Sequence, residues 1–138
     1  MLTYLSMTSR PDIAYSVHQW ARLSTNPKRS HELAARGIVR YLKGTAKKGC
    51  FLNPTERKTL DCYVDADFAG NQTQLTCQEP ASVKSRTGYV ILFANCQLLW
   101  ASKLQSEVAL STTEAEYIAI SLAMRNLIPL QSLLQDII

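Results

Sequence analysis

The sequence predicts a mixed α/β fold in which two helices are followed by three antiparallel strands and one long helix. The main observation behind this prediction is a change of period along the chain. Apolar residues recur at helical spacing up to about residue 43, alternate with polar residues from about residue 60, and return to helical spacing after residue 114. With 138 residues, the chain has room for one modest domain, or for a partial domain preceded by helices.

Two helices are expected at the start of the chain. Residues 9–12 (Ser-Arg-Pro-Asp) begin the first one, because an early proline and an acidic first turn are typical start signals. The second covers roughly residues 30–43 and ends at Gly44. One flank of it carries a row of cations at helical spacing: Arg36, Arg40, Lys43 and Lys47. A solvated helix face and contact with nucleic-acid phosphates both explain such a row.

The middle of the chain has the alternating pattern of β-strands. The first strand covers residues 60–65 and ends at an aspartate, Asp65. A polar loop, residues 71–86, precedes a second strand over residues 88–94. A turn then leads into a third strand over residues 98–102, so the last two strands form a hairpin.

The final helix carries two glutamates near its start. Residues 111–114 (Ser-Thr-Thr-Glu) have the form of a capping box, and Pro129 is expected to kink or interrupt the helix. At about 100° per residue, Glu114 falls on a polar face, so capping and solvation explain it. Glu116 falls on the stripe that is expected to press on the sheet, which contains Ile120, Ala123, Leu127 and Leu134.

A carboxylate on a buried helix edge needs a cation, a hydrogen-bond donor or a metal ion. Asp65 ends a largely apolar strand, and we expect it to point into a site. A Mg²⁺ ion shared by Asp65 and Glu116 is one interpretation, since Mg²⁺ takes oxygen ligands. The other is that Glu116 lies in the first turn, where the helix dipole and solvent make it tolerable. The residues alone leave both interpretations open.

Composition limits the classes of protein that are possible. A hydrophobic content of 46% and a charged content of 19% are typical of a globular chain, and a net charge of +4 permits nucleic acid as a partner. The cysteines lack CxxC spacing, so buried free thiols are expected and a zinc site is not: Cys50, Cys62, Cys77 and Cys96. Neither a signal peptide nor an apolar run of membrane-spanning length is present, so an intracellular protein without a membrane partner is expected.

Four blocks of sequence follow one another in the second part of the chain. They are Tyr-Val-Asp-Ala-Asp-Phe-Ala-Gly at 63–70, Ser-Arg-Thr-Gly-Tyr-Val at 85–90, Leu-Trp-Ala-Ser-Lys at 99–103 and Ala-Leu-Ser-Thr-Thr-Glu-Ala-Glu-Tyr at 109–117. In this order they resemble the first half of the ribonuclease H domain in the Pol polyprotein of copia-type retrotransposons. Any one block is a weak signal, and the ordered set is a strong one.

Two earlier blocks extend the resemblance. Ser-Arg-Pro-Asp-Ile-Ala-Tyr at 9–15 and Arg-Tyr-Leu-Lys-Gly-Thr at 40–45 resemble the C-terminal region of the reverse transcriptase in the same polyprotein. The resemblance thus covers nearly the whole chain. It divides the chain into a helical reverse-transcriptase or connection segment, residues 1–48, and a partial ribonuclease H-like domain, residues 58–138.

The resemblance implies a mixed five-stranded sheet with strand order 3-2-1-4-5, of which this chain contains an incomplete part. It implies an endonuclease, a hydrolase of the RNA strand of RNA–DNA hybrids, that uses two Mg²⁺ or Mn²⁺ ions. Asp65 would contact both ions, and Glu116 would hold the ion that activates the attacking water. Ser111 and Thr112 would cap the helix and contact the 2′-hydroxyls of the RNA.

One expected block is missing. The family's next strand carries a third aspartate within an Asp-Asn-Gln sequence, which has no counterpart here. We therefore expect a fragment that is inactive alone and needs the remainder of a Pol polyprotein or a complementing chain. We also expect the first strand to have an open edge.

Two other functions stay open. One is a non-catalytic nucleic-acid binder that contacts phosphates through five cations, Arg36, Arg40, Lys43, Lys84 and Arg86. The other is a retrotransposon remnant that acts as a protein-interaction module.

Overall fold

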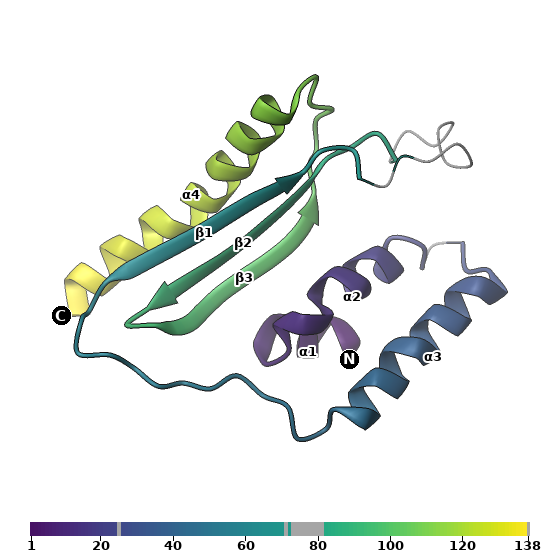
Figure 1. Cartoon of the computed structure of the whole chain (residues 1–138), viewed down its shortest axis with the longest axis horizontal. Coiled ribbons are helices and arrows are strands. Elements are labelled where there is room, and N and C mark those ends of the chain that lie inside the picture. The colour runs from purple at the N-terminus through teal and green to yellow at the C-terminus, as the bar shows by residue number, and fades with distance from the viewer. Residues whose placement is uncertain (25, 71, 73–81, 138) are drawn as a thin grey trace. The chain divides into compact units, whose positions relative to one another are not determined.

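The structure is a computed structural model that describes residues 1–138 except 25, 71, 73–81 and 138. The chain forms two compact units, unit 1 (Met1–Phe51) and unit 2 (Leu52–Ile138). Unit 1 is helical, and unit 2 contains three antiparallel strands and a long helix (Figure 1). The mixed α/β class is therefore confirmed, whereas the identities assigned to residues 1–48 and 58–138 stay predictions.

Unit 1 has more helices than the sequence predicted. Its elements are α1 (Leu2–Thr8), the 3-10 turn η1 (Pro11–Ile13), α2 (Ala14–Ala21) and α3 (Arg29–Gly44). Helix α1 was missed because it has no side-chain cap and no charged residue in its first or last turn. Packing supports it instead, since Leu2 and Leu5 lie against the core of the unit.

The core of unit 1 is small and lies between its helices. Ile13, Val17 and Ile38 are its buried residues, with exposed fractions of 2%, 1% and 9%. Trp20 covers one side, and its indole N–H donates to the carbonyl of His31 at 3.1 Å. This bond joins α2 to the first turn of α3, so the indole is fixed at both its apolar and its polar end.

A polar tie joins η1 to the end of α3. Arg10 is only 7% exposed, and its guanidinium donates to the Asp12 carboxylate at 2.8 and 2.9 Å. It also donates to the carbonyl and the hydroxyl of Thr45, at 3.2 and 2.7 Å. The Tyr41 hydroxyl donates to Asp12 at 2.9 Å. The hydrogen bonds from Arg10, together with the one from Tyr41, lower the pKa of Asp12 to about 2.

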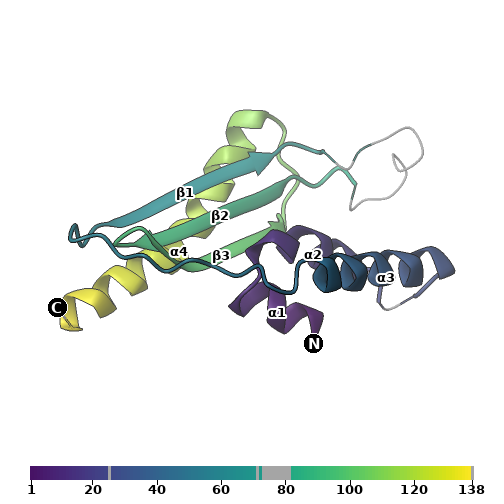
Figure 2. The ribbon, with the colours of Figure 1, turned by 60° about the horizontal axis from the view of Figure 1, so that its bottom comes forward.

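Unit 2 is a three-stranded antiparallel sheet covered by one helix. The strands are β1 (Leu60–Asp67), β2 (Arg86–Phe93) and β3 (Cys96–Leu104), in the order β1-β2-β3. Helix α4 (Thr112–Ile137) packs against β1 and β2 on one face of the sheet (Figures 1 and 2). Among the described strands β1 pairs only with β2, so the predicted open edge of the first strand is confirmed.

The hairpin between β2 and β3 is also confirmed. Phe93 pairs with Cys96, which leaves Ala94 and Asn95 as the two loop residues. Both have positive φ, 49° and 68°, the combination of a type I′ turn. Asparagine tolerates this conformation, whereas alanine adopts it at a cost of about 1 kcal/mol.

Small residues set the contact between α4 and the sheet. Ala115, Ala119 and Ala123 are 0%, 0% and 1% exposed, so the helix backbone lies close to the strands. The helix continues through Pro129, so an interruption is excluded, whereas a kink at this residue stays a prediction. Pro129 and Arg125, whose carbonyl loses its helical donor, are both exposed, so water can satisfy that carbonyl.

Helix α4 is long and apolar enough to cross a membrane when judged by length and composition only. This corrects the expectation that no segment reaches that length. Only 11% of its most apolar 18-residue stretch is buried in the structure, and several large apolar side chains are exposed: Tyr117, Ile120, Met124, Ile128 and Leu133. A single helix of this kind is weak evidence for a membrane span, because core helices meet the same criterion.

The Arg10–Asp12 tie predicts how acid affects unit 1. Because the pKa of Asp12 is lowered from 3.8 to about 2, its stabilising contribution is complete above pH 4 and is lost as the pH falls toward 2. Between pH 2 and pH 4 this contribution changes the free energy of unfolding by about 1 kcal/mol, a value reduced to allow for the partial exposure of Asp12 to solvent. We expect Asp12→Asn to abolish this change. Urea unfolding followed by Trp20 fluorescence, in a Trp100→Phe background, measures it. An unchanged pH slope in the variant would contradict the role of the tie.

The turn conformation predicts a stabilising substitution. We expect Ala94→Gly to raise the free energy of unfolding by about 1 kcal/mol, because glycine adopts positive φ without strain. The matched control is Ala66→Gly within β1, where the same change is expected to destabilise by about 0.5–1 kcal/mol. Urea unfolding of both variants tests the assignment, and equal signs for the two changes would refute it.

Candidate active site

The exposed face of β1 carries the acidic residues of the strand. Its burial alternates strictly, and the half-buried residues Leu60, Cys62, Val64 and Ala66 face α4. Asp61, Asp65 and Asp67 lie on the other face together with Tyr63, whose exposed fraction is 64%. Within the described residues the Asp65 carboxylate takes part in no hydrogen bond or ion pair. It is exposed on the face of the sheet that α4 does not cover.

Glu116 does not lie on the buried stripe of α4. It is exposed, as is Ile120 at 48%, whereas the stripe against the sheet is formed by Ala115, Ala119 and Ala123. The predicted burial of Glu116 is therefore wrong. The prediction ranked the helix faces by hydrophobicity and therefore chose the face that contains Ile120. In the structure the helix packs so close to the strands that small side chains form the contact. Glu116 needs no compensating cation, so a metal role for it depends on the resemblance.

The start of α4 is capped as the sequence predicted. The Ser111 hydroxyl accepts a hydrogen bond from the Glu114 N–H at 3.1 Å. The Glu114 carboxylate in turn accepts from the Leu110 N–H at 2.7 Å. Thr112 is the first helical residue and is exposed, like Ser111. This cap fixes the first turn of the helix, and Glu116 follows it at the start of the second turn.

Gln105 connects this helix start to the sheet. It is 1% exposed, and its side-chain amide donates to the Thr87 hydroxyl at 3.1 Å and to the Ala115 carbonyl at 2.8 Å. Thr87 pairs with Ala66, the neighbour of Asp65, and Ala115 precedes Glu116. Gln105 thus links the start of α4 to the end of the sheet near which both acids lie. Sequence reasoning missed it, although a glutamine directly after an apolar strand was a usable signal.

The predicted phosphate contacts differ in their surroundings. Arg40 and Lys43 are exposed on α3, and Arg36 forms an exposed ion pair with Glu32 at 2.7 Å. Lys84 is half-buried in unit 2, and its ammonium donates to the Ser106 carbonyl.

Arg86 is 4% exposed and donates to the carbonyl and hydroxyl of Ser102, at 3.4 and 3.3 Å. Its guanidinium is thus buried in this structure, and its predicted contact with phosphate stays a prediction.

The described residues contain no cluster of metal-binding side chains. Among them, no group of three or more His, Cys, Asp or Glu side chains could hold a metal ion. Asp65 and Glu116 offer carboxylate oxygens, the donors that Mg²⁺ prefers, but two side chains do not form a complete site.

The cysteines were expected to be free and buried. Cys50, Cys62 and Cys96 are free but half-buried, and Cys77 lies outside the described residues. Burial raises the pKa of the Cys62 thiol, so this cysteine is less reactive than an exposed one.

The fold and the candidate site place the chain in one class of protein: a mixed α/β domain with an exposed carboxylate on an edge strand, Asp65, and another on the adjoining helix, Glu116. The chain is 40% identical to the retrovirus-related Pol polyprotein from transposon TNT 1-94 of Nicotiana tabacum, over 99% of this chain and 10% of that protein. It is 36% identical to the corresponding polyprotein from transposon RE1 of Arabidopsis thaliana, over 87% of this chain and 8% of that protein.

A third relative is short. Secreted RxLR effector protein 161 of Plasmopara viticola is 33% identical over 87% of this chain and 79% of that protein. The chain is homologous, over most of its length, to copia-type retrotransposon Pol polyproteins and to this short effector protein. It spans a tenth or less of the length of the two polyproteins. No protein-family model matches it, and no solved structure does.

The buried amide of Gln105 predicts a stability effect. Gln105→Ala leaves the Thr87 hydroxyl and the Ala115 carbonyl without their donor, so we expect a loss of about 2 kcal/mol in the free energy of unfolding. Gln97→Ala, at an exposed position of β3, is the control and should change it by less than about 0.5 kcal/mol. Urea unfolding followed by Trp100 fluorescence measures both, and equal effects would refute the anchoring role.

Proposed function

We propose that this chain is the part of a copia-type Pol polyprotein in which the end of reverse transcriptase joins the beginning of ribonuclease H. In this proposal Asp65 and Glu116 belong to a site that hydrolyses the RNA strand of RNA–DNA hybrids. The observation that carries it is that two exposed acids, Asp65 near the end of β1 and Glu116 near the start of α4, lie at the same end of unit 2, where Gln105 links β2 to α4. The similarity to two Pol polyproteins supports this proposal. The proposal implies an intracellular location.

The two acids have distinct roles in this proposal. Divalent ions, Mg²⁺ or Mn²⁺, would supply the charge that activates water and stabilises the departing oxygen. Asp65 would hold metal from the end of β1, and Glu116 would hold it from the start of α4, at the same end of unit 2. Gln105 keeps these two elements together through its bonds to Thr87 and Ala115. Ser111 and Thr112 are exposed at the helix start, where they could contact an RNA backbone.

The site requires further ligands. Two carboxylates cannot fix two divalent ions in the geometry of an in-line displacement. The remaining acids would come from the rest of a Pol polyprotein or from a complementing chain. Activity would therefore appear only in such an assembly, and the chain alone would bind a hybrid without cleaving it.

A direct test is cleavage of a labelled RNA–DNA hybrid in Mg²⁺ and in Mn²⁺. We expect no cleavage by the chain alone. When the segment that follows the homologous region in the TNT 1-94 polyprotein is fused to the C-terminus, we expect metal-dependent cleavage of the RNA strand. Asp65→Asn and Glu116→Gln in the fusion should each lower the rate about 100-fold or more, because both remove a metal ligand.

The controls separate catalysis from contamination and from unfolding. Asp61→Asn changes an acid on the same face of the same strand and should leave the rate unchanged within about twofold. Circular dichroism verifies that all variants are folded. Equal cleavage by the fusion and its Asp65→Asn, Glu116→Gln double variant would exclude the proposed site.

A second candidate function is nucleic-acid binding without catalysis. Arg40 and Lys43 are exposed on α3 and have no hydrogen-bond or ion-pair partner among the described residues. The match to 79% of a short effector protein further supports a role for this segment outside a polyprotein. The same hybrid distinguishes this function, since phosphate binding predicts an affinity that falls steeply with salt and that Arg40→Gln, Lys43→Gln weakens. It also predicts no cleavage by the fusion.

A further inference from the structure

Gly88 leaves an open position in the sheet directly beside Asp65. The two residues are cross-strand partners in the register of β1 and β2, so they share the face of the sheet that α4 does not cover. Ser102 of β3 is the next residue in the same row. Because glycine has no side chain, this row contains one open position, between the side chains of Asp65 and Ser102.

The fold does not require glycine at this position. Gly88 does not have a positive φ, so other residues can adopt its backbone conformation. A Cβ atom on it would meet no atom of the described residues within 4 Å, so there is room for a side chain. Glycine inside a strand also lowers stability, because it loses more backbone freedom on folding than other residues do. The glycine therefore has a cost and no reason from packing within the described part of the chain.

The approach of a ligand explains a glycine of this kind. Inside strands, glycine often marks a place where a ligand or another backbone comes close to the chain. Asp65 is exposed and is the acid that β1 contributes to the proposed site. Since the Cβ atoms of cross-strand partners lie only about 5 Å apart, a side chain at position 88 would border the Asp65 carboxylate. The open position is thus a way to reach Asp65 along the surface of the sheet.

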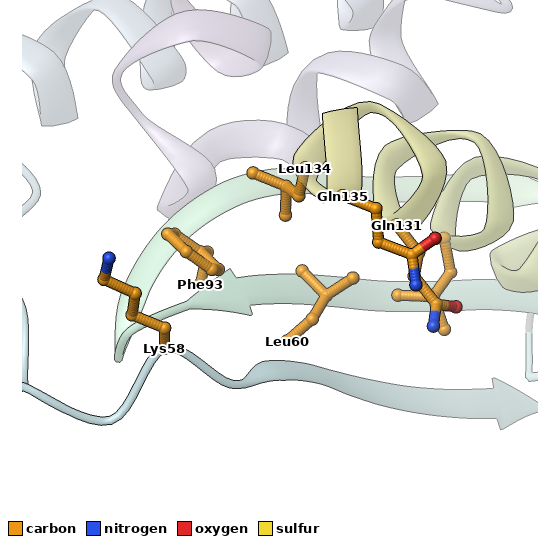
Figure 3. Close-up of a pocket in the computed structure, with 7 residues that line it drawn as sticks. Lys58, Leu60, Phe93, Gln131, Leu134 and Gln135 are labelled. Atoms are coloured by element: carbon orange, nitrogen blue, oxygen red, sulfur yellow. The ribbon is translucent and has the colours of Figure 1, made fainter. Parts of the chain in front are cut away.

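A groove at the other end of β1 does not lead to Asp65. Figure 3 shows the side chains of Leu60, Phe93 and Leu134 around this groove, with Lys58 at one end. Leu60 begins β1 and lies on the face toward α4, whereas Asp65 lies near the end of the strand on the opposite face. Leucine and phenylalanine side chains form much of its wall, which does not suit a charged phosphodiester. The groove has a volume of about 560 Å³ and is lined by Lys58, Leu60, Phe93, Leu127, Gln131, Leu134 and Gln135.

We propose that Gly88 determines access to Asp65, because the missing side chain lets the phosphodiester of the RNA strand approach this carboxylate along the sheet. The inference rests on the proposed function and adds to it a residue that controls entry to the site. A wide approach is needed, since a divalent ion such as Mg²⁺ keeps several of its waters when it binds. Gly88 makes no bond to the substrate and acts only through the space that it leaves.

The test combines activity with stability, because an access role and a structural role predict opposite results. It uses the fusion with the segment that follows the homologous region in the TNT 1-94 polyprotein. We expect Gly88→Ala to lower kcat/KM for hybrid cleavage about tenfold, and Gly88→Val to lower it about 100-fold. Both changes should raise the melting temperature by about 3 °C, because alanine and valine lose less backbone freedom than glycine on folding. A glycine that is kept for structure would lose activity and stability together.

A second readout measures access without cleavage. The fusion receives Asp65→Cys in a background in which every other cysteine is replaced by alanine. The reaction rate of the introduced thiol is measured with a small reagent, methyl methanethiosulfonate, and with a bulky one, dithiobis-nitrobenzoate. We expect Gly88→Val to slow the bulky reagent about fivefold and the small reagent less than about twofold, because the reaction depends on access to the sulfur.

Two substitutions away from the site are matched controls. Gln97→Val places the same β-branched side chain at an exposed position near the start of β3 and should leave the cleavage rate within about twofold. Gln131→Trp adds a larger side chain to the groove of Figure 3 and should also leave the rate within about twofold. Circular dichroism verifies that all variants are folded.

The outcomes separate this inference from the proposed function. If the fusion without substitutions does not cleave the hybrid, both are wrong. If it cleaves and Gly88→Val cleaves equally well, only the role of Gly88 is wrong. A melting temperature lowered by Gly88→Val would show that the glycine is needed for packing against the added segment. Equal rates with the bulky reagent before and after Gly88→Val would show that residue 88 does not control access.

Discussion

The contact between the alanines of α4 and the sheet is the constraint on which unit 2 depends. Three strands form a surface that a single helix can cover on one face only, and Ala115, Ala119 and Ala123 let that helix approach closely. The Gln105 amide fixes the helix start at the same end, through one bond to β2 and one to Ala115. The direction of every other side chain on α4 follows from this contact, including that of Glu116.

Because α4 covers only one face of the sheet, the other face is left exposed, and one edge of β1 pairs with no described strand. The strict alternation of β1 places its apolar residues toward α4 and its aspartates on the open face. Carboxylates on an open face keep their hydration, so this arrangement costs little stability. Unit 1 is stabilised differently. Its apolar core is small, and the buried Arg10 guanidinium adds hydrogen bonds that join η1 to the end of α3.

The strands, the hairpin and the helix cap could be predicted because each has a local signal. Period-two alternation marked β1, and the Ser111–Glu114 capping box marked the start of α4. Helix α1 has no such signal and depends on packing. The environment of Glu116 was predicted wrongly because the stripes at Ala115 and Ile120 are both apolar, and only the distance between helix and sheet selects the smaller residues. The burial of Arg86 could not be predicted, because it results from the pairing of β2 with β3.

Asp65 lies beside the edge of β1 that pairs with no other described strand, so a strand added there would bring its own side chains next to Asp65. If that strand carries acids, the like charges repel unless a divalent ion lies between them. Completion of the sheet at this edge would then require metal, which links the fold of a longer chain to the proposed hydrolysis.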